Sequence, residues 1–218
     1  MGPGKLRARL LERGYRSSFA DHGFFKPPRE SLLSGRPRAR YVLEVFGGGC
    51  RLSAACHWTG LHTIGGLDLQ IGDWHDLSDP RVQSVLQRWF RAGLIWFIWW
   101  GTPCTPWSQA RQGRPTSHPA HCLAAITVKL MEIAHKCGIL QALENPLTSG
   151  LWKWPPMKRM LERANFGYVQ FPMCAYGAAY RKWTQIATTA PGLLSLSRSC
   201  TCTVPHERLQ GKVNLMGV

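Results

Sequence analysis

Apolar residues between positions 41 and 190 fall into two alternating kinds of segment. Short continuous apolar runs, typical of buried strands, occupy 41–45, 62–69, 94–101 and 139–146. Apolar residues at helical spacing predict helices over 51–60, 79–93, 124–138 and 154–165. Two later runs, 168–174 and 184–189, predict closing strands that form an antiparallel pair. This alternation of strands and helices predicts an α/β fold with a mostly parallel sheet.

Composition is consistent with one such domain. The chain has 218 residues, of which 44% are hydrophobic, and it shows no internal repeat and no second core. No apolar run reaches the roughly 18 to 20 residues needed to span a bilayer, and the N-terminus shows no signal-peptide pattern. We therefore expect an intracellular protein with reduced thiols. Its eight cysteines are then core, catalytic or metal-binding residues rather than a disulfide framework.

The charge is strongly basic and unevenly distributed. The net charge is +15, and residues 1–40 hold ten Lys and Arg against three Asp and Glu. Such a charge predicts a polyanionic partner, most often nucleic acid. We expect three parts: a basic, flexible arm over 1–40, a catalytic domain over 41–190, and an irregular tail over 191–218.

Unusual polar and glycine residues follow the predicted strands at their carboxyl ends. In a parallel sheet these ends share one edge, where ligands bind. The residues concerned are Gly47, Gly48 and Gly49 after the first strand, Asp68 at the end of the second, Pro103 and Cys104 after the third, and Glu144 and Asn145 at the end of the fourth. Each is a weak signal alone, since the glycines could form only a tight turn. Their common placement predicts a ligand site.

Four motifs in this order resemble those of the cytosine-C5 DNA methyltransferase family. They are "LEVFGGGCRLSAA", "GTPCTPWS", "LENP" and "CAYGAAYRKWTQIAT", and their order and spacing agree over roughly residues 41–190. The resemblance is closest to the compact members found in phages and mobile elements. It implies a Rossmann-like class I fold, dependent on S-adenosyl-L-methionine, with an antiparallel closing strand.

The resemblance also implies a set of cofactor-binding residues. Asp68 lies about 20 residues beyond the glycine turn, as expected of an acid on the cofactor ribose, although a surface carboxylate is the alternative. Asp76 could accept from the adenine amino group or cap the following helix. The implied cofactor residues are Phe46, Gly47, Gly48, Gly49, Asp68, Leu69, Asp76 and Pro103.

The implied chemistry explains the residue types on the catalytic side. A Cys104 thiolate adding at C6 of cytosine would make C5 nucleophilic. A protonated Glu144 would hydrogen-bond N3 of the ring, and Asn145 would orient the loop or the base. Lys182 would bind phosphate or the active-site loop. The alternatives are a core thiol at Cys104, a turn-capping acid at Glu144 and a solvated charge at Lys182.

Substrate contacts are expected on both sides of the nucleophile. Trp107 could stack on a base or on the cofactor, or simply pack in the core. A base inside a duplex cannot be reached, so the target base must be flipped out or already unpaired. The expected substrate-binding residues are Thr105, Trp107, Ser108, Arg38 and Arg40.

Three functions remain open from the sequence. Methylation of DNA is the first. Methylation of a structured RNA is the second, because no long target-recognition region is evident. The third is a catalytically idle nucleic-acid-binding relative, because Cys50 stands where a glycine is usual in the family and Thr105 stands where a glutamine is usual.

The tail contains one further group of candidate ligands. Cys200, Cys202 and His206, with Cys174 upstream, could form a Cys3His zinc site that stabilises a tail with little core. The Cys-x-Cys spacing is tight. Unliganded thiols in a loose tail are the interpretation that the sequence favours.

Overall fold

The computed structural model describes residues 40–72, 75–107 and 119–207. Several predictions concern residues outside these ranges: the basic arm before Arg40, with Arg38, the substrate contact at Ser108, and the tail beyond Glu207. Among the described residues, no helix combines the length and the apolar character that crossing a membrane would require.

The centre of the molecule is a six-stranded sheet with the spatial order β2-β1-β3-β4-β6-β5. β2, β1, β3 and β4 run parallel, and β6 runs antiparallel to both of its neighbours. The predicted mostly parallel sheet and its antiparallel closing pair are therefore confirmed. The strands are Tyr41–Val45 (β1), Thr63–Leu67 (β2), Ile95–Trp100 (β3), Leu140–Pro146 (β4), Gly167–Pro172 (β5) and Trp183–Thr188 (β6).

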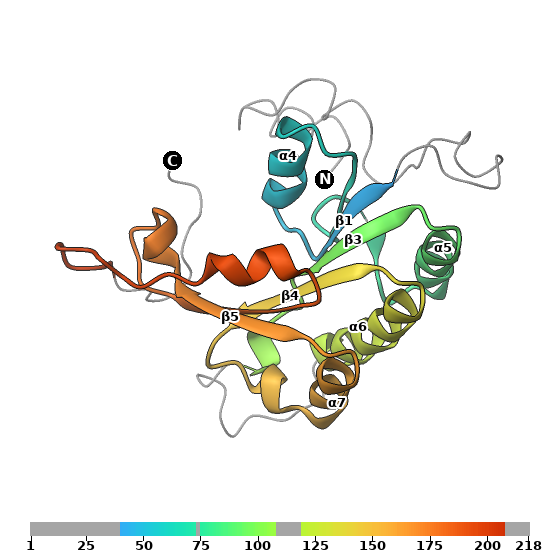
Figure 1. Ribbon diagram of the computed structural model, residues 1–218. Coiled ribbons are helices and arrows are strands. Elements are labelled where there is room, and N and C mark those ends of the chain that lie inside the picture. Colours follow the sequence, from blue (N-terminus) through green and yellow to red (C-terminus); the bar gives the residue numbers. More distant parts are fainter. Residues whose placement is uncertain (1–39, 73–74, 108–118, 208–218) are drawn as a thin grey trace.

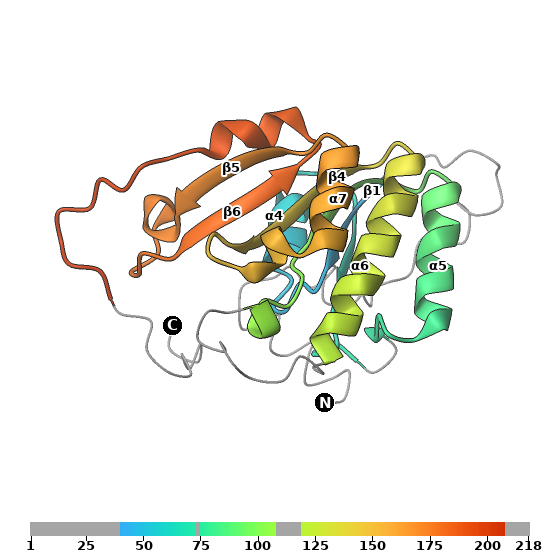
Figure 2. The same cartoon turned by 90° about the horizontal axis from the view of Figure 1, so that it is seen from below.

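Helices cover both faces of this sheet. α5, α6 and α7 lie side by side on one face, and α4 lies on the other (Figures 1 and 2). Their bounds are Arg51–Trp58 (α4), Pro80–Arg91 (α5), Pro119–Lys136 (α6) and Pro155–Arg163 (α7). This layered, mostly parallel architecture confirms the predicted Rossmann-like fold. β1 lies between β2 and β3 in the sheet, so the chain reverses its direction of travel across the sheet after β2.

The core lies between the sheet and the layer of α5, α6 and α7. Leu43, Ile98 and Leu143 on the three central strands are fully buried. The buried Trp100 Nε1 donates a hydrogen bond of 3.1 Å to Gln141 Oε1, so its one polar group is satisfied. The tryptophan-rich run of β3 is thus part of the core, and its packing holds the carboxyl ends of the neighbouring strands in place.

Two segments differ from the prediction. α6 begins at Pro119 rather than at residue 124. A proline in the first turn of a helix loses no hydrogen bond, so Pro119 starts the helix instead of interrupting it. Residues 191–196, expected to be irregular, form a 3-10 helix on β5, where Leu194 lies over Gly167. The early start of α6 places His121 and Leu123 at the site described below.

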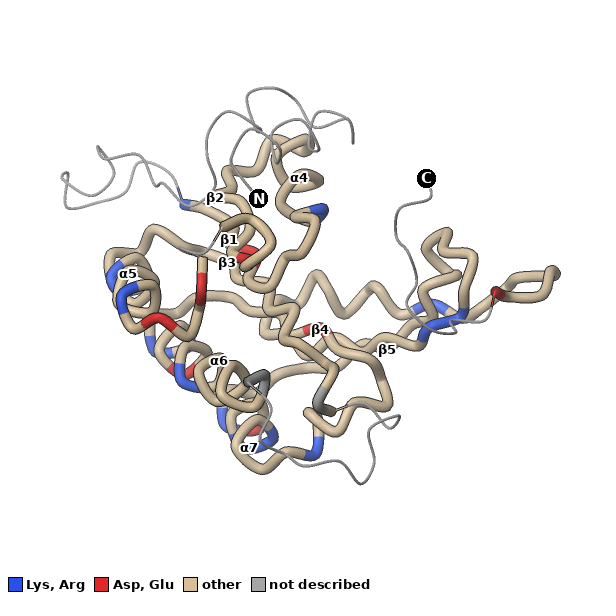
Figure 3. Tube along the Cα trace, turned by 180° about the vertical axis from the view of Figure 1, so that it is seen from behind, with Lys and Arg blue, Asp and Glu red and all other residues tan. Residues whose placement is uncertain are grey.

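Charged residues of the described part lie mainly on its outer surface. Lys and Arg recur along α5, α6 and α7, and a second group lies near one end of β5 (Figure 3). Arg88, Lys129 and Lys158 on the helices are exposed, as is Arg181 near β5. Positive charge is therefore present on the folded domain as well as in the N-terminal sequence.

Candidate active site

A cavity of about 300 Å³ opens at the carboxyl ends of β1, β2 and β3, where the strand order reverses. Ligands of open α/β sheets bind at this position. The lining includes six of the eight predicted cofactor residues, Phe46, Gly48, Asp68, Leu69, Asp76 and Pro103. Gly47 and Gly49 belong to the same turn but do not line the cavity. Six further residues complete the lining and were not predicted from the sequence: Leu67, Gln70, His75, Leu77, Gly101 and Leu123.

The glycine turn after β1 has an unusual backbone. Phe46, Gly48 and Cys50 all adopt positive φ angles, of 60°, 52° and 52°. A Cβ on Gly47 would lie 2.9 Å from the Glu44 side chain, so this position needs glycine for close packing. Two non-glycine residues at positive φ store some backbone strain, a feature that clusters at functional sites.

Asp68 connects this turn to the end of β2. Its Oδ2 accepts a hydrogen bond of 2.8 Å from the Gly48 N–H, and its Oδ1 accepts one of 2.8 Å from the Gln70 N–H. Each carboxylate oxygen can accept a second bond. Asp68 is thus held in place at the cavity wall with acceptor capacity available for a hydroxyl group.

Glu44 packs against the glycine turn and binds the start of α4, a role that was not predicted from the sequence. Only 5% of its surface is exposed, and its Oε2 accepts from both the N–H and the hydroxyl of Ser53, at 2.8 and 2.7 Å. Burial raises the pKa of Glu44, and the hydrogen bonds from Ser53 oppose that rise. The one available signal was a charged residue within an otherwise apolar strand.

Cys50, which raised doubt about the cofactor turn, is a buried residue that packs against β2. Its side chain is 2% exposed, and a Cβ on Gly66 would lie 2.3 Å from its Sγ, so the sulfur occupies the space above that glycine. Burial raises the pKa of the Cys50 thiol, which keeps it protonated. Cys50 is therefore a packing residue and is not among the described residues that line the cavity.

The far wall of the cavity carries His75 and Asp76. His75 is 1% exposed, and its Nδ1 accepts from the Asp68 N–H at 3.4 Å. Burial lowers the pKa of His75 to about 4, in spite of the nearby Asp68 carboxylate, so the ring is neutral at pH 7. Asp76 Oδ1 accepts from the Ser78 N–H, and Asp79 is the residue that caps α5. The alternative in which Asp76 caps that helix is therefore wrong.

The loop after β3 brings Cys104 next to the cavity. Pro103 lines the cavity and Cys104, half-buried, follows it directly. The Cys104 carbonyl accepts from the Trp107 N–H at 2.9 Å, which closes a short 3-10 turn over Thr105–Trp107. Thr105 is exposed. Cys104 is thus adjacent in sequence to a cavity residue and is not fully buried in the core.

Asn145 connects this loop to β4. It is 1% exposed, and its Nδ2 donates to the Thr102 carbonyl at 2.8 Å and to the Glu144 carbonyl at 3.0 Å. Its Oδ1 is buried without a hydrogen-bond partner among the described residues. A buried acceptor without a partner costs folding free energy, so Asn145 Oδ1 is a candidate to accept a hydrogen bond from a bound ligand. The amide fixes the backbone two residues before Cys104.

Glu144 is half-buried and pairs with Ile186 of β6. Burial raises the pKa of its carboxyl group, and the ammonium group of Lys182 opposes the rise. Burial that favours the neutral acid makes the carboxyl group a hydrogen-bond donor at higher pH than an ordinary glutamate. Lys182 is half-buried and immediately precedes β6.

The Trp107 ring packs against the protein. Its centroid lies 4.5 Å from the His121 ring and 5.3 Å from the Trp154 ring, so it is joined to α6 and to the start of α7. These contacts correspond to the packing alternative for this tryptophan. Arg40 is exposed directly before β1.

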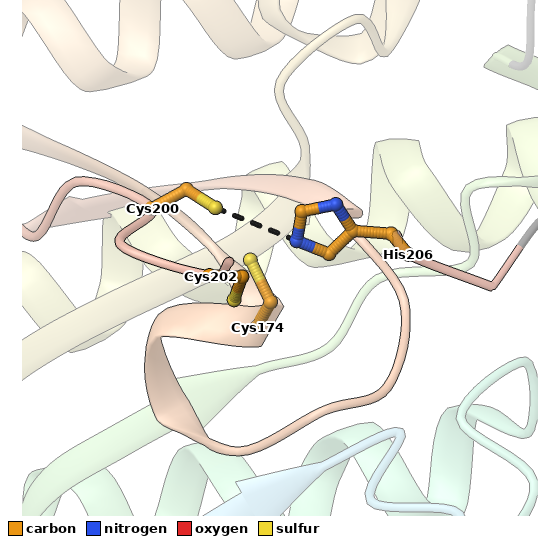
Figure 4. Close-up of side chains that lie close together, drawn as sticks. All are labelled: Cys174, Cys200, Cys202 and His206. Carbon is orange, nitrogen blue, oxygen red and sulfur yellow. Dashed lines mark hydrogen bonds between the residues drawn. The ribbon is translucent and has the colours of Figure 1, made fainter. Parts of the chain in front are cut away.

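The four candidate metal ligands lie together away from the cavity residues. Cys174, Cys200, Cys202 and His206 converge from two segments that are distant in sequence (Figure 4). The tail that carries three of them is therefore placed against the end of β5 rather than loose, contrary to the expectation from sequence.

No family model matches the chain, and no curated protein matches it. Among solved structures, the Dnmt2 methyltransferase of S. pombe is similar, with a TM-score of 0.47 and 10% identity over 78% of this chain and 58% of that chain. The methyltransferase EhMeth of Entamoeba histolytica has a TM-score of 0.47 and 12% identity, over 71% and 54%. A mutant of Spodoptera frugiperda DNMT2 has a TM-score of 0.43 and 16% identity, over 70% and 52%. This chain spans little more than half the length of each, and the values describe a distant likeness of fold.

Proposed function

We propose that the protein transfers a methyl group from S-adenosyl-L-methionine to C5 of cytosine in DNA, with Cys104 as the nucleophile. The observation that carries the proposal is the continuity between cavity and thiol. Pro103 forms part of the cavity wall, and Cys104 is the next residue of the same loop. A cofactor in the cavity and a base held at Cys104 would therefore meet at the carboxyl ends of β3 and β4.

The cavity fits this cofactor in size and chemistry. Its volume of about 300 Å³ lies at the lower end of the range of roughly 300 to 1,000 Å³ for small-molecule sites. Asp68 presents oriented carboxylate oxygens for ribose hydroxyls, and Asp76 presents one for an amino group. The neutral His75 would add no positive charge to a cavity that holds a cationic cofactor. When bound, S-adenosyl-L-methionine supplies an electrophilic methyl group to C5.

Cys104 and Glu144 account for the activation of cytosine. The Cys104 thiolate forms a bond to C6 and displaces an electron pair toward C5. The protonated Glu144 carboxyl group donates to N3 and stabilises the charge that develops on the ring. C5 would then bond to the methyl group, and the electron pair of the broken sulfur–methyl bond would remain on the sulfur of the departing neutral thioether. Loss of the C5 proton to a base from solvent would return an electron pair to the ring, break the bond from C6 to Cys104 and restore the thiolate.

Asn145 and Lys182 position these two groups. The Asn145 amide holds the Thr102 carbonyl, which limits movement of the Cys104 loop. Lys182 supplies positive charge near Glu144, where it can interact with a phosphate of the flipped nucleotide. Thr105, exposed beside Cys104, contacts the nucleotide, and Arg40 contributes to phosphate binding.

The experiment that tests the proposal is transfer of a labelled methyl group to matched DNA and RNA, each containing cytosine. We expect label on DNA from the wild type and none from Cys104→Ser. Cys137→Ser is the matched control, because Cys137 is an exposed thiol at the end of α6. Label on RNA alone would replace the substrate with RNA. Label on neither would contradict methyl transfer.

A further inference from the structure

A second site lies where the C-terminal segment meets the end of β5. Cys174 belongs to the 3-10 helix Met173–Tyr176, which follows β5 directly, and Cys200, Cys202 and His206 come from the segment after residue 196. The four ligand atoms all lie within 4.8 Å of one another. Figure 4 shows the three cysteine side chains and the imidazole ring gathered close together.

The geometry is close to that of a tetrahedral metal site. With Zn–S bonds of about 2.3 Å and Zn–N bonds of about 2.0 Å, neighbouring ligand atoms in a tetrahedron are about 3.5 to 3.8 Å apart. The observed separation between Cys200 Sγ and His206 Nε2 is 3.4 Å. Contraction of the remaining separations, at most 4.8 Å, requires only small side-chain movements.

The chemistry of the ligands selects the metal. Three thiolates and one imidazole are typical of zinc, whereas magnesium and calcium prefer oxygen ligands. A site with four protein ligands leaves no open position for substrate, which is the arrangement of structural rather than catalytic zinc. Binding displaces the thiol protons to solvent.

The backbone around the cluster already brings its two segments together. The Glu207 N–H donates to the Ala179 carbonyl at 3.0 Å, beside a bridge between Tyr180 and Glu207. Nearer the start of the segment, the Tyr176 hydroxyl donates to the Leu196 carbonyl at 2.7 Å, and the Arg198 guanidinium lies 4.6 Å from the Tyr176 ring centroid. These contacts lie on both sides of the ligands and hold them in register.

Hydrophobic burial does little to hold this segment. Residues 197–207 are exposed except for Cys200 and His206, which are half-buried, and Val204 is 70% exposed. A segment with so little apolar burial needs another source of stability, and a metal can supply it.

We propose that Cys174, Cys200, Cys202 and His206 form a structural Cys3His zinc site that fastens residues 197–207 to the end of β5. This site is independent of methyl transfer. Its occupancy can be measured without substrate, so failure of one proposal leaves the other intact.

The test is the metal content of the full chain, purified without chelator and measured by elemental analysis with native mass spectrometry. We expect about one zinc per chain, falling below about 0.1 in Cys200→Ser and in His206→Ala. Cys137→Ser and His135→Ala are matched controls, since both residues are exposed near the end of α6, and they should retain the metal. Absence of zinc from the wild type, or full retention in both cluster variants, would overturn the proposal.

A second measurement avoids variants that fail to fold. Wild-type protein stripped with a chelator and reloaded with cobalt should show the visible d–d absorption of a tetrahedral site and thiolate-to-cobalt charge transfer. Titration with zinc should remove both. Thiol counting on the denatured, metal-free chain should find all eight cysteines reduced. A disulfide between two of the three cluster cysteines, or an octahedral cobalt spectrum, would overturn the proposal.

Discussion

The parallel part of the sheet, β2-β1-β3-β4, and its antiparallel margin, β6-β5 with residues 173–207, are stabilised in different ways. The parallel strands lie between helices, and their central residues are fully buried. On β5, exposed and buried positions alternate, Tyr168 is half exposed, and much of the following chain faces solvent. The cavity and the Cys104 loop thus stand on the well-packed part. The margin has a smaller buried cluster that includes Val169, Phe171 and Ile186, and its exposed end over residues 197–207 is held by turns, ring contacts and the proposed zinc.

The two parts meet at the pairing of β4 with β6. Glu144 lies on β4, opposite Ile186, and Lys182 immediately precedes β6. Glu144, the proposed proton donor, therefore belongs to the parallel part of the sheet, and the positive charge of Lys182 that acts on it comes from the margin. The rate of methyl transfer should therefore be strongly affected by substitutions in the parallel part and only weakly by substitutions in the margin.

After the loss of the nucleophile itself, the largest effect is expected at Glu144. Glu144→Ala should lower the rate of methyl transfer by about 10²- to 10⁴-fold, the usual range for a lost general acid. Cofactor affinity should change little, because Glu144 does not line the cavity. Single-turnover rates at saturating DNA, with calorimetry of cofactor binding, check both parts. A loss confined to cofactor affinity would mean that Glu144 acts in cofactor binding and not in the activation of cytosine.

The same carboxyl group predicts a pH dependence. Burial raises the folded-state pKa of Glu144 above its ordinary value, so the active protonated form is complete at low pH and is lost as pH rises through that pKa. Its contribution to folding stability has the same sign and is also lost as pH rises. Glu144→Gln keeps a neutral donor and should remove this decline from the rate profile. An unchanged profile would show that another group titrates.

The basic N-terminal sequence provides the next test. Its deletion shows whether phosphate binding depends on residues 1–38 or on the folded domain. Deleting residues 1–38 should weaken binding to all DNA sequences alike and flatten the salt dependence by about 0.9 in log K per lost phosphate contact. The rate at saturating DNA should stay nearly constant. Fluorescence anisotropy over a range of salt concentrations measures the slope. A retained slope would assign phosphate binding to the folded domain, with Arg181 and Arg198 of the margin as its first candidates.

A smaller effect is expected at Asp68. Asp68→Ala removes a charged hydrogen-bond acceptor from the cavity wall and should weaken cofactor binding by about 1 to 3 kcal/mol, or roughly 5- to 150-fold. Asp79→Ala is a useful control, because that carboxylate caps α5 and does not line the cavity. Calorimetry measures both variants. Equal losses in the two would mean that the effect comes from folding and not from the ligand.

The smallest effect on cofactor binding should follow removal of zinc. A chelator should speed proteolysis within residues 197–207 at least about tenfold, because the segment has little apolar burial of its own. Cofactor affinity should change less than about twofold, because the cavity stands on the parallel strands. A large loss of cofactor affinity would show that the two parts are more tightly coupled than their contacts indicate.

Sequence patterns predicted those features that depend on contiguous residues. The strands, the closing antiparallel pair and the run Pro103–Cys104 are of this kind, because period and local motif suffice to find them. The roles of Glu44, His75 and Leu123 depend on contacts in the folded chain. Glu44 binds Ser53, His75 binds the Asp68 N–H, and Leu123 lines the cavity with residues that follow β3, and apolar spacing does not predict these contacts. The start of α6 was predicted at residue 124 instead of Pro119, because apolar spacing alone does not mark the first turn of a helix. The convergence of Cys174 on the tail depends on the path of the chain after β6, which has no sequence period.

The most direct test of the central claim is the covalent adduct with DNA containing 5-fluorocytosine. Fluorine at C5 blocks the final elimination, so the bond from the nucleophile to C6 should persist in the presence of S-adenosyl-L-methionine. Peptide mapping should place the adduct on Cys104 in the wild type and in Cys137→Ser, and Cys104→Ser should form none. An adduct on another cysteine, or equal yield from Cys104→Ser, would contradict the account.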